Sequence, residues 1–314
     1  MEKTHYDLII IGAGPAGITA GVYAARKQID TLIISKDVGG QAMWSSQIEN
    51  YPGFVYVSGV ELVRKFEEHL RTFDIKLRYA AVSSLERVGE VYHVTTEDGA
   101  VFVGRAVIVS SGKSPRLLNV PGEKEFTGRG VAYCSTCDGP LFAGMDVAVV
   151  GGGNSGLDAV AQMMRICPKV YLIEAEDELR ADEVMRQKAR AAENVEILTA
   201  TTVKEIRGDA FVHSIVVQNV HTGELRTLEV KGVFVEVGLV PNSDFAKNVL
   251  RLNEWGEIPV DCGARTGVPG LFAAGDVTDV PQKQIICAAG DGAKAALGAY
   301  SYLVRQRIPT DWVR

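Results

Sequence analysis

Along most of the chain, short apolar runs alternate with longer segments rich in apolar residues. A short apolar run bounded by glycine or polar residues is typical of a buried strand, and a longer apolar segment is typical of a helix. The predicted strands cover residues 6–11, 31–34, 147–150, 169–173 and 270–274. Three helices are predicted: the first ends near residue 26, the second spans 157–165 and the third spans 286–304. This alternation predicts an α/β fold built on parallel sheets.

The first predicted strand ends at a glycine-rich turn that runs from Gly12 to Gly17 and leads into a helix. In such a turn the first glycine permits the bend, the second lets backbone amides approach a pyrophosphate, and the third lets helix and strand pack closely. The helix N-terminus then faces the phosphates. Glycines at strand ends also serve packing alone, but the apolar strand directly before this turn favours dinucleotide binding.

A second turn of the same kind runs from Gly151 to Gly156 after the strand at 147–150, and it also leads into a helix. The next predicted strand ends at Glu174. A carboxylate there can accept hydrogen bonds from both hydroxyls of an adenosine ribose and repels a 2′-phosphate. The alternative is a solvent-facing acid in a patch with residues 176–178, and we favour the ribose role.

The strand after the first turn ends in Ser35 and Lys36, without an acid, and a carboxylate for that site stands far along the chain at Asp276. If Asp276 completes the first site, the first domain is split and the second is inserted within it. We therefore predict two Rossmann-like dinucleotide-binding domains, residues 1–117 with 243–314 and residues 118–242, joined through proline-containing segments at 114–121 and 240–244. A length of 314 residues favours two domains as well.

Cys134 and Cys137 form a C-x-x-C pair between the two turns, with Asp138 directly behind them. Such a pair can cycle between dithiol and disulfide, and without an extracellular cysteine pattern it is more often redox-active than structural. The alternatives are half of a zinc site or two unremarkable thiols. Zinc needs four ligands, whereas the other three cysteines are scattered singly, so we predict no metal. Asp138 is either a proton shuttle for a leaving thiolate or a helix-capping acid.

Composition and charge narrow the setting. The net charge is −6 and no basic run is present, which argues against a nucleic acid or an anionic membrane surface as partner. Glu2 and Asp7 precede the uncharged run 8–25, and glycines interrupt it, so it resembles neither a signal peptide nor a membrane-spanning helix. Five cysteines, an odd number, argue against an extracellular disulfide framework. We expect a cytoplasmic protein.

Taken together, the motifs resemble the low-molecular-weight thioredoxin reductase family over essentially the whole chain. The matching motifs are the two glycine turns, Gly39-Gly40-Gln41, Glu49-Asn50-Tyr51-Pro52-Gly53, the segment from Cys134 to Gly139, and Gly275-Asp276 with Lys283-Gln284. The resemblance implies FAD in the split domain, a nicotinamide dinucleotide in the inserted domain, and a homodimer.

The resemblance and the glycine turns together assign expected roles. Cys137 is expected to face the flavin, Cys134 to attack the disulfide of a partner, and Asp138 to donate a proton. The residues expected at the FAD are Gly12, Gly14, Pro15, Ala16, Gly17, Ser35, Lys36, Gly39, Gly40, Gln41, Asn50, Gly112, Gly275, Asp276, Lys283, Gln284 and Ile285. Those expected at the nicotinamide dinucleotide are Gly151, Gly153, Asn154, Ser155, Gly156 and Glu174.

The inserted domain departs from NADPH-selective members of the family, which carry a histidine and paired arginines after the second strand. Here the stretch from Ile173 to Arg180 is acidic. This half is more similar to the flavoprotein subunit of alkyl hydroperoxide reductase, which uses NADH, so we predict NADH as the preferred cofactor and keep NADPH as the alternative. That subunit begins with a disulfide-bearing thioredoxin-fold extension, which is absent before Gly12, so we expect the electrons to leave to a separate protein.

The expected activity is electron transfer from NADH through FAD and the Cys134–Cys137 disulfide to thioredoxin or a thioredoxin-like or glutaredoxin-like dithiol protein. The nearest alternative is an electron donor of a peroxiredoxin system. A flavoprotein that senses nucleotide redox state without turnover is the alternative from a different class. Because the cysteine pair and the nicotinamide belong to one domain yet must reach one flavin ring, we expect approach from opposite faces or a rotation of the inserted domain, and the resemblance implies the rotation.

Overall fold

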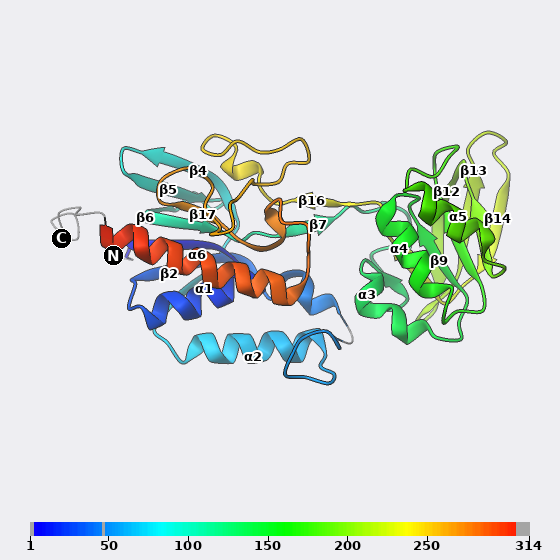
Figure 1. Cartoon of the computed structure of the whole chain (residues 1–314), viewed down its shortest axis with the longest axis horizontal. Helices are drawn as coiled ribbons and strands as arrows, with labels where there is room; N and C mark the ends of the chain where they lie inside the picture. Colours follow the sequence, from blue (N-terminus) through cyan, green and yellow to red (C-terminus); the bar gives the residue numbers. More distant parts are fainter. Residues whose placement is uncertain (1–2, 46–47, 306–314) are drawn as a thin grey trace. The chain divides into compact units, whose positions relative to one another are not determined.

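The computed structural model describes residues 3–45 and 48–305. These residues pack into two compact units, which Figure 1 shows in sequence colours: unit 1 comprises the described residues of 1–43, 50–114 and 240–314, and unit 2 those of 44–49 and 115–239. Most of unit 2 is thus a single insertion into unit 1, and both units contain a parallel sheet with helices. The predicted fold class, two Rossmann-like domains with the second inserted in the first, is confirmed.

Unit 1 is built on a seven-stranded sheet of order β3-β2-β1-β6-β5-β4, with β17 paired to β6. Its strands are β1 His5–Ala13, β2 Thr31–Val38, β3 Lys76–Tyr79, β4 Val82–Val88, β5 Val91–Thr96, β6 Val101–Val109 and β17 Leu271–Ala273. Strands β3, β2, β1, β6 and β17 run parallel, while β4 and β5 form an antiparallel extension. The helices are α1 Pro15–Arg26, α2 Gly59–Arg71 and α6 Ile285–Arg305, with short 3-10 turns η1 Gly40–Trp44, η3 Asp244–Ala246 and η4 Gly275–Val277.

The central strands β1, β6 and β17 are buried on both faces, as the uninterrupted apolar runs of parallel strands require. Leu8 and Ile10 of β1 pack with α1 and α6 on one face, and Ile9 and Ile11 pack on the other face with the segment that contains Leu250. Figure 1 shows α1 and α6 side by side along the sheet. Gly292 of α6 makes that approach possible, since a Cβ there would lie 2.0 Å from the carbonyl oxygen of Ala16.

Unit 2 contains a five-stranded parallel sheet of order β11-β10-β9-β15-β8 and a separate antiparallel sheet of order β12-β13-β14. The strands are β8 Val131–Ala132, β9 Val147–Val150, β10 Val170–Ile173, β11 Val195–Leu198, β12 Thr201–Gly208, β13 Val212–Asn219, β14 Leu225–Glu229 and β15 Gly232–Val235. The helices are α3 Ser135–Asp138, α4 Asn154–Met163 and α5 Glu183–Ala191, and η2 Gly139–Phe142 follows α3. The chain enters and leaves this unit through β7 Lys113–Pro115 and β16 Leu239–Pro241, which pair with each other.

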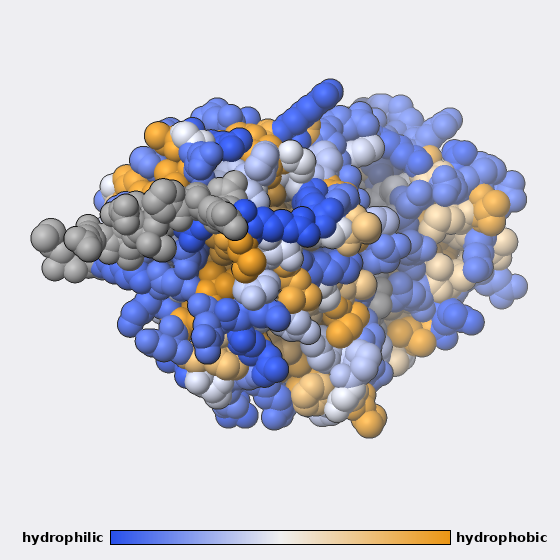
Figure 2. Space-filling view, turned by 60° about the vertical axis from the view of Figure 1, so that its left-hand side comes forward, coloured by the Kyte–Doolittle hydropathy of each residue, from blue (hydrophilic) through white to orange (hydrophobic). Residues whose placement is uncertain are grey.

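The surface mixes polar and apolar residues. Figure 2 shows hydrophilic residues interspersed with smaller groups of hydrophobic ones on the face that it presents. Among residues 3–45 and 48–305, no helix combines the length and apolar character that crossing a bilayer demands.

Candidate functional site

The glycine turn of unit 1 has the geometry of a phosphate cradle. Gly12 has φ +106°, and a Cβ on it would lie 2.4 Å from the carbonyl oxygen of Ser110. A Cβ on Gly17 would lie 1.8 Å from the carbonyl oxygen of Gly12, so neither position tolerates a side chain. Gly14 is the N-cap of α1 and has open space, with its nearest neighbour 4.0 Å away. The first amides of α1 have no side-chain cap, so the turn fits a pyrophosphate group.

Several predicted residues meet this turn at the carboxyl end of the unit 1 sheet. The hydroxyl of Ser35 accepts a hydrogen bond from the amide of Ala13 at 3.0 Å, whereas Lys36 is exposed. Gly39 and Gly40 both have positive φ, and the amide of Gly39 donates to the carbonyl of Ala13 at 2.8 Å. This loop therefore folds back onto the turn.

Two side-chain amides tie further predicted positions of unit 1 together. The Nε2 of Gln41 donates to the carbonyl of Lys113 at 2.7 Å, next to Gly112, which also has positive φ. The Nδ2 of Asn50 donates to the Oε1 of Gln284 at 3.1 Å, at the start of α6 and directly before Ile285. Residues 234 positions apart in sequence thus contact each other.

Asp276 lies in η4, directly after β17, and it is placed by close packing. Gly275 before it has φ +75°, and a Cβ there would lie 3.0 Å from the Cβ of Ala16 in the first turn of α1. Burial raises the pKa of Asp276, and the positive charges of Lys283 and Lys113 oppose that rise. The structure thus brings Asp276 to the first glycine turn, as the split-domain interpretation requires.

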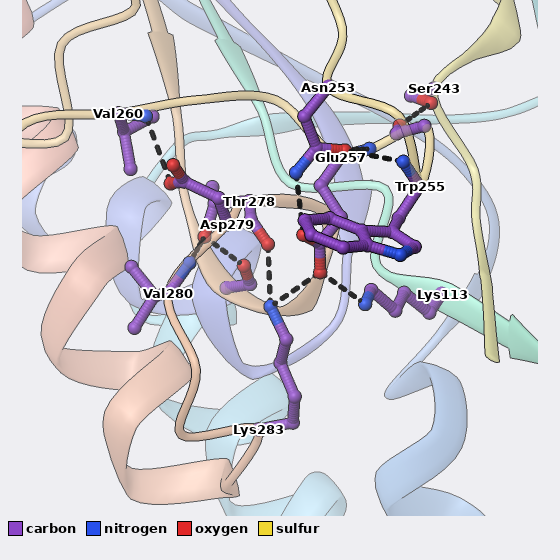
Figure 3. A network of polar contacts seen from close by, with 12 residues as sticks. Lys113, Ser243, Asn253, Trp255, Glu257, Val260, Thr278, Asp279, Val280 and Lys283 are labelled. Carbon is purple, nitrogen blue, oxygen red and sulfur yellow. Dashed lines mark hydrogen bonds and ion pairs between the residues drawn. The ribbon is translucent and has the colours of Figure 1, made fainter. Parts of the chain in front are cut away.

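The two lysines that act on Asp276 belong to a lysine–glutamate cluster formed by Lys113, Glu257 and Lys283. Figure 3 shows these three residues at close range. Glu257 lies between the two lysines: its Oε1 is 2.6 Å from the Nζ of Lys113 and 3.4 Å from that of Lys283. Lys283 also donates to the carbonyl of Thr278 at 2.5 Å. Burial lowers the pKa of Lys283, and the charge of Lys113 lowers it further. Sequence reasoning missed Lys113 and Glu257, because single charged residues outside the glycine and cysteine motifs carry no signal of their own.

The glycine turn of unit 2 repeats the geometry of the first. Gly151 has φ +121°, and a Cβ on it would lie 2.4 Å from the carbonyl oxygen of Glu236. A Cβ on Gly156 would lie 1.8 Å from the carbonyl oxygen of Gly151. Gly153 is the N-cap of α4 and has nothing within 4 Å. Asn154 and Ser155 open α4 at this end, and both are exposed.

Glu174 lies against this second turn and not among the exposed acids that follow it. Its Oε2 accepts a hydrogen bond from the amide of Gly152 at 2.6 Å, and its Oε1 accepts one from the amide of Glu176 at 2.9 Å. The guanidinium of Arg180 pairs with Glu176 at 2.5 Å. The Glu174 carboxylate is therefore held at the edge of the second glycine turn, and Arg180 has an anionic partner in Glu176.

The predicted redox pair forms a disulfide between Cys134 and Cys137, with Cα atoms 5.3 Å apart. The pair follows β8 at the carboxyl end of the unit 2 sheet, and Cys134 is partly buried there. Cys134 is the N-cap of α3, and its sulfur accepts a hydrogen bond from the amide of Cys137 at 3.2 Å. Asp138 is the last residue of this single turn and the N-cap residue of η2, where its side chain makes no capping hydrogen bond.

The remaining cysteines are separate from this pair. Cys167 is buried, and burial together with the charge of Asp146 raises the pKa of its thiol to about 11. Cys262 is exposed and Cys287 is partly buried. Within the part of the chain that the structure describes, no group of three or more His, Cys, Asp or Glu side chains is arranged to hold a metal ion.

Glu236 is a further acid of unit 2 that sequence reasoning did not identify. It follows β15 directly, its amide donates to the carbonyl of Val150 at 2.8 Å, and its carboxylate accepts a hydrogen bond from the amide of Ser135 at 3.3 Å. Burial raises the pKa of Glu236 to about 7 against the opposing effect of the Ser135 hydrogen bonds. The available signal was a charged residue directly after the buried run Gly232–Val235.

Comparison with known proteins agrees with this geometry. The family model described as pyridine nucleotide-disulphide oxidoreductase matches residues 6–292. The chain is 42% identical over 304 residues to an "NADH dehydrogenase" of Bacillus subtilis and 42% identical over 305 residues to a subunit of alkyl hydroperoxide reductase from Staphylococcus aureus. Each match covers 97% of this chain and 60% of the relative's length.

Solved structures show the same relationship. The thioredoxin reductase of Streptococcus pyogenes matches with a TM-score of 0.89 and 39% identity, covering 97% of this chain and 100% of that one. The thioredoxin reductase of Giardia duodenalis matches with a TM-score of 0.87 and 32% identity, covering 96% of this chain and 100% of that one. The resemblance drawn from the motifs is therefore confirmed, and the chain belongs to the pyridine nucleotide-disulphide oxidoreductase family.

Proposed function

We propose that the chain is a flavoprotein disulfide reductase that passes electrons from NADH through FAD and the Cys134–Cys137 disulfide to thioredoxin or a thioredoxin-like or glutaredoxin-like dithiol protein. One observation carries the proposal. A C-x-x-C disulfide stands at the carboxyl end of a parallel sheet that has its own dinucleotide turn, in a chain that has a second such turn. Two nucleotide sites and one reducible disulfide are the parts that such an electron path needs.

Unit 1 holds FAD in this proposal, and residues 1–117 with 243–314 form the FAD-binding domain. The turn from Gly12 to Gly17 receives the pyrophosphate on the uncapped end of α1, and Asp276 accepts hydrogen bonds from the sugar-like chain. Bound FAD supplies the chemistry of taking two electrons from a nicotinamide and giving them to a disulfide. The lysine–glutamate cluster places two cations beside Asp276.

The second turn holds the nicotinamide dinucleotide, and residues 118–242 form its domain. Glu174 is placed to accept hydrogen bonds from the ribose hydroxyls, since its carboxylate lies against Gly152. NADH is the preferred form, because a 2′-phosphate would meet this carboxylate, and Arg180 is paired with Glu176. NADPH is the alternative if Arg180 leaves that pair.

Within the redox pair, Cys134 attacks the acceptor disulfide, Cys137 faces the flavin, and Asp138 provides the proton for the leaving thiolate. The relatives named thioredoxin reductase support a thioredoxin-like acceptor, and we propose that the working form is a homodimer.

Two single-cysteine variants test the electron path. Cys137→Ser should bind FAD and oxidise NADH with artificial acceptors while losing protein-disulfide reduction. Cys134→Ser should also lose that activity but, because it keeps the Cys137 thiolate, should show a long-wavelength thiolate-to-flavin absorbance band. Cys262→Ser is the matched control, since Cys262 is exposed and lies outside the pair. Finding the band in Cys137→Ser would reverse the assignment of the two sulfurs, and a protein that takes up no FAD would refute the proposal.

Donation of electrons to a peroxiredoxin is the second candidate function. The 42% identity to the alkyl hydroperoxide reductase subunit of S. aureus favours it. A peroxide-consumption assay with NADH, a peroxiredoxin and a separate small dithiol carrier distinguishes the candidates. Turnover that requires all components supports the peroxiredoxin role, and reduction of the carrier without peroxide turnover supports a general thioredoxin-like acceptor.

A further inference from the structure

A carboxylate that belongs to none of the recognised motifs lies beside the redox pair. β15 and β8 are neighbouring parallel strands, so Glu236 after β15 and the cysteine turn after β8 meet at the same edge of the sheet. The Glu236 carboxylate accepts the amide of Ser135, the buried first residue of α3, at 3.3 Å. Ser135 stands directly between Cys134 and the rest of the turn. The acid therefore anchors the backbone that carries the disulfide.

We propose that Glu236 is a positioning residue for the redox pair, which holds the Cys134–Cys137 turn through Ser135, gains a proton when the disulfide is reduced and releases it when the disulfide re-forms. The inference deepens the proposed function and rests on it, because proton uptake at this position matters only if the pair cycles.

The charge balance explains the coupling. Two electrons and one proton break the S–S bond of Cys134 and Cys137 and leave one thiol and one thiolate; the electron pair comes from a reduced flavin in turnover or from a small dithiol in vitro. The thiolate adds a negative charge close to the Glu236 carboxylate in a partly buried site, and like charges there disfavour each other. Glu236 therefore takes one further proton from solvent. Transfer of the electron pair to an acceptor disulfide removes the charge, and Glu236 returns that proton.

The groups around Glu236 hold the pKa of its carboxyl group near neutrality. Burial raises its pKa to about 7, the hydrogen bonds from Ser135 oppose the rise, and the negative charge of Asp158 on α4 adds to it. The other titratable groups on the neighbouring segment are Cys134 at the N-cap of α3 and Cys137 and Asp138 within it. Tyr133, after β8, donates its hydroxyl to Glu123 at 3.2 Å. A carboxyl group with a pKa near neutrality changes its protonation readily when a neighbouring charge appears.

The test is the equilibrium between Cys134–Cys137 and a dithiothreitol redox buffer at pH 6 and pH 8, read by thiol alkylation of the full chain. Glu236→Gln keeps the shape and the acceptor for Ser135 but cannot ionise. At pH 6 wild type and Glu236→Gln should be reduced with nearly equal equilibrium constants. At pH 8 wild type should be about three- to tenfold harder to reduce than the variant, because Glu236 is then charged. Glu229→Gln, at an exposed position on β14, should match wild type at both pH values.

A ratio of wild type to Glu236→Gln that is the same at both pH values would overturn the inference, since a purely structural role is independent of pH. If Glu236→Gln does not fold, Asp158→Asn, at an exposed position of α4, is compared with wild type in the same redox buffer over a series of pH values from 5 to 9. Loss of that negative charge should lower the pH at which the pair becomes harder to reduce, and an unchanged pH profile would overturn the proposal. Dithiothreitol supplies the electrons, so failure of NADH to reduce the pair would refute the proposed function without affecting this result.

Discussion

The two glycine turns share one backbone design and differ in the side chains that complete it. In unit 1, Ser35 follows the second strand's apolar run and accepts the amide of the turn's second residue, at 3.0 Å. In unit 2, Glu174 occupies the same position and accepts the corresponding amide at 2.6 Å. The residue after the neighbouring strand is Ser110 in unit 1 and Glu236 in unit 2, and its carbonyl lies against the first glycine in each case. Two serines in one unit thus correspond to two glutamates in the other.

This difference shows that the backbone of the turn is constrained in both units, whereas the side chains beside it vary. Gly17 and Gly156 are equally constrained, since a Cβ added to either would lie 1.8 Å from a carbonyl oxygen, because strand and helix must meet closely wherever the turn is used. The strand-end side chains are not bound by that requirement. Unit 1 takes its carboxylate from distant Asp276 and adds two lysines, whereas unit 2 places two acids of its own at the sheet edge. The backbone of the turn is therefore common to both units, whereas the side chains beside it give each turn a different charge.

The sharpest way to separate the two sites is to block one turn at a time. Gly17→Ala should abolish FAD binding and Gly156→Ala should abolish NADH binding. Each substitution should weaken the binding free energy by more than ~3 kcal/mol, because a Cβ at either position would meet a backbone oxygen. Flavin absorbance of the purified protein measures the first effect, and fluorescence titration with NADH measures the second. Gly156→Ala should remain yellow.

Two glycines with open space serve as controls for this experiment. Gly14→Ala and Gly153→Ala meet nothing closer than 4.0 Å, so their urea unfolding curves should match wild type even where nucleotide affinity falls. Loss of FAD in Gly156→Ala would show that the two sites do not form independently.

The lysine–glutamate cluster distinguishes unit 1 from unit 2 by its positive charge. Glu257→Gln removes the anion between Lys113 and Lys283, and breaking such a partly buried pair should cost about 2–4 kcal/mol of unfolding free energy. Urea denaturation measures the loss. Glu254→Gln, on the same loop but exposed, should change stability by less than ~0.5 kcal/mol. Equal effects of the two variants would mean that the cluster contributes nothing specific.

Exchanging one strand-end residue converts unit 2 toward unit 1. In the proposed ribose role, the Glu174 carboxylate contributes about 2–4 kcal/mol of discrimination against a 2′-phosphate, so Glu174→Ser should remove the proposed preference for NADH. That is about thirty- to about a thousandfold in the ratio of kcat/KM for NADH to that for NADPH. Glu178→Ser, in the exposed acidic stretch, is the matched control and should keep the ratio. A wild-type protein without any preference would contradict the ribose role of Glu174.

Sequence patterns predicted the repeated parts of this molecule better than the isolated ones. The strand at 147–150 has its predicted bounds, and the helix predicted at 286–304 spans Ile285–Arg305, because apolar periodicity and glycine turns are local signals. The helix predicted at 157–165 begins earlier, at Asn154, since the polar first turn carries no apolar signal. The antiparallel strands β12 to β14 and the acids Glu236 and Glu257 were not predicted. Their positions depend on pairing between distant segments, which a single sequence does not display.

The prediction with the smallest expected effect compares Ser110, which follows β6, with Glu236, the corresponding residue after β15. It tests whether Glu236 brings a titrating charge to this position. Burial raises the pKa of Glu236 from an ordinary value of 4.5 to about 7, so the folded chain binds this proton more tightly than the unfolded chain does. Between about pH 4.5 and pH 7 the folded state therefore holds more protons, and the contribution of Glu236 to stability falls as the pH rises through this range.

Glu236→Gln, which cannot ionise, should lack this fall. The difference in unfolding free energy, variant minus wild type, should therefore be about 1–3 kcal/mol larger at pH 8 than at pH 5, so that the variant gains stability relative to wild type as the pH rises. Ser110→Ala should change stability by the same amount at both pH values, because a hydroxyl does not titrate in this range. Urea unfolding of the oxidised protein at the two pH values measures both differences, and parallel pH dependence in wild type and Glu236→Gln would show that the Glu236 carboxyl is solvated like an ordinary surface acid.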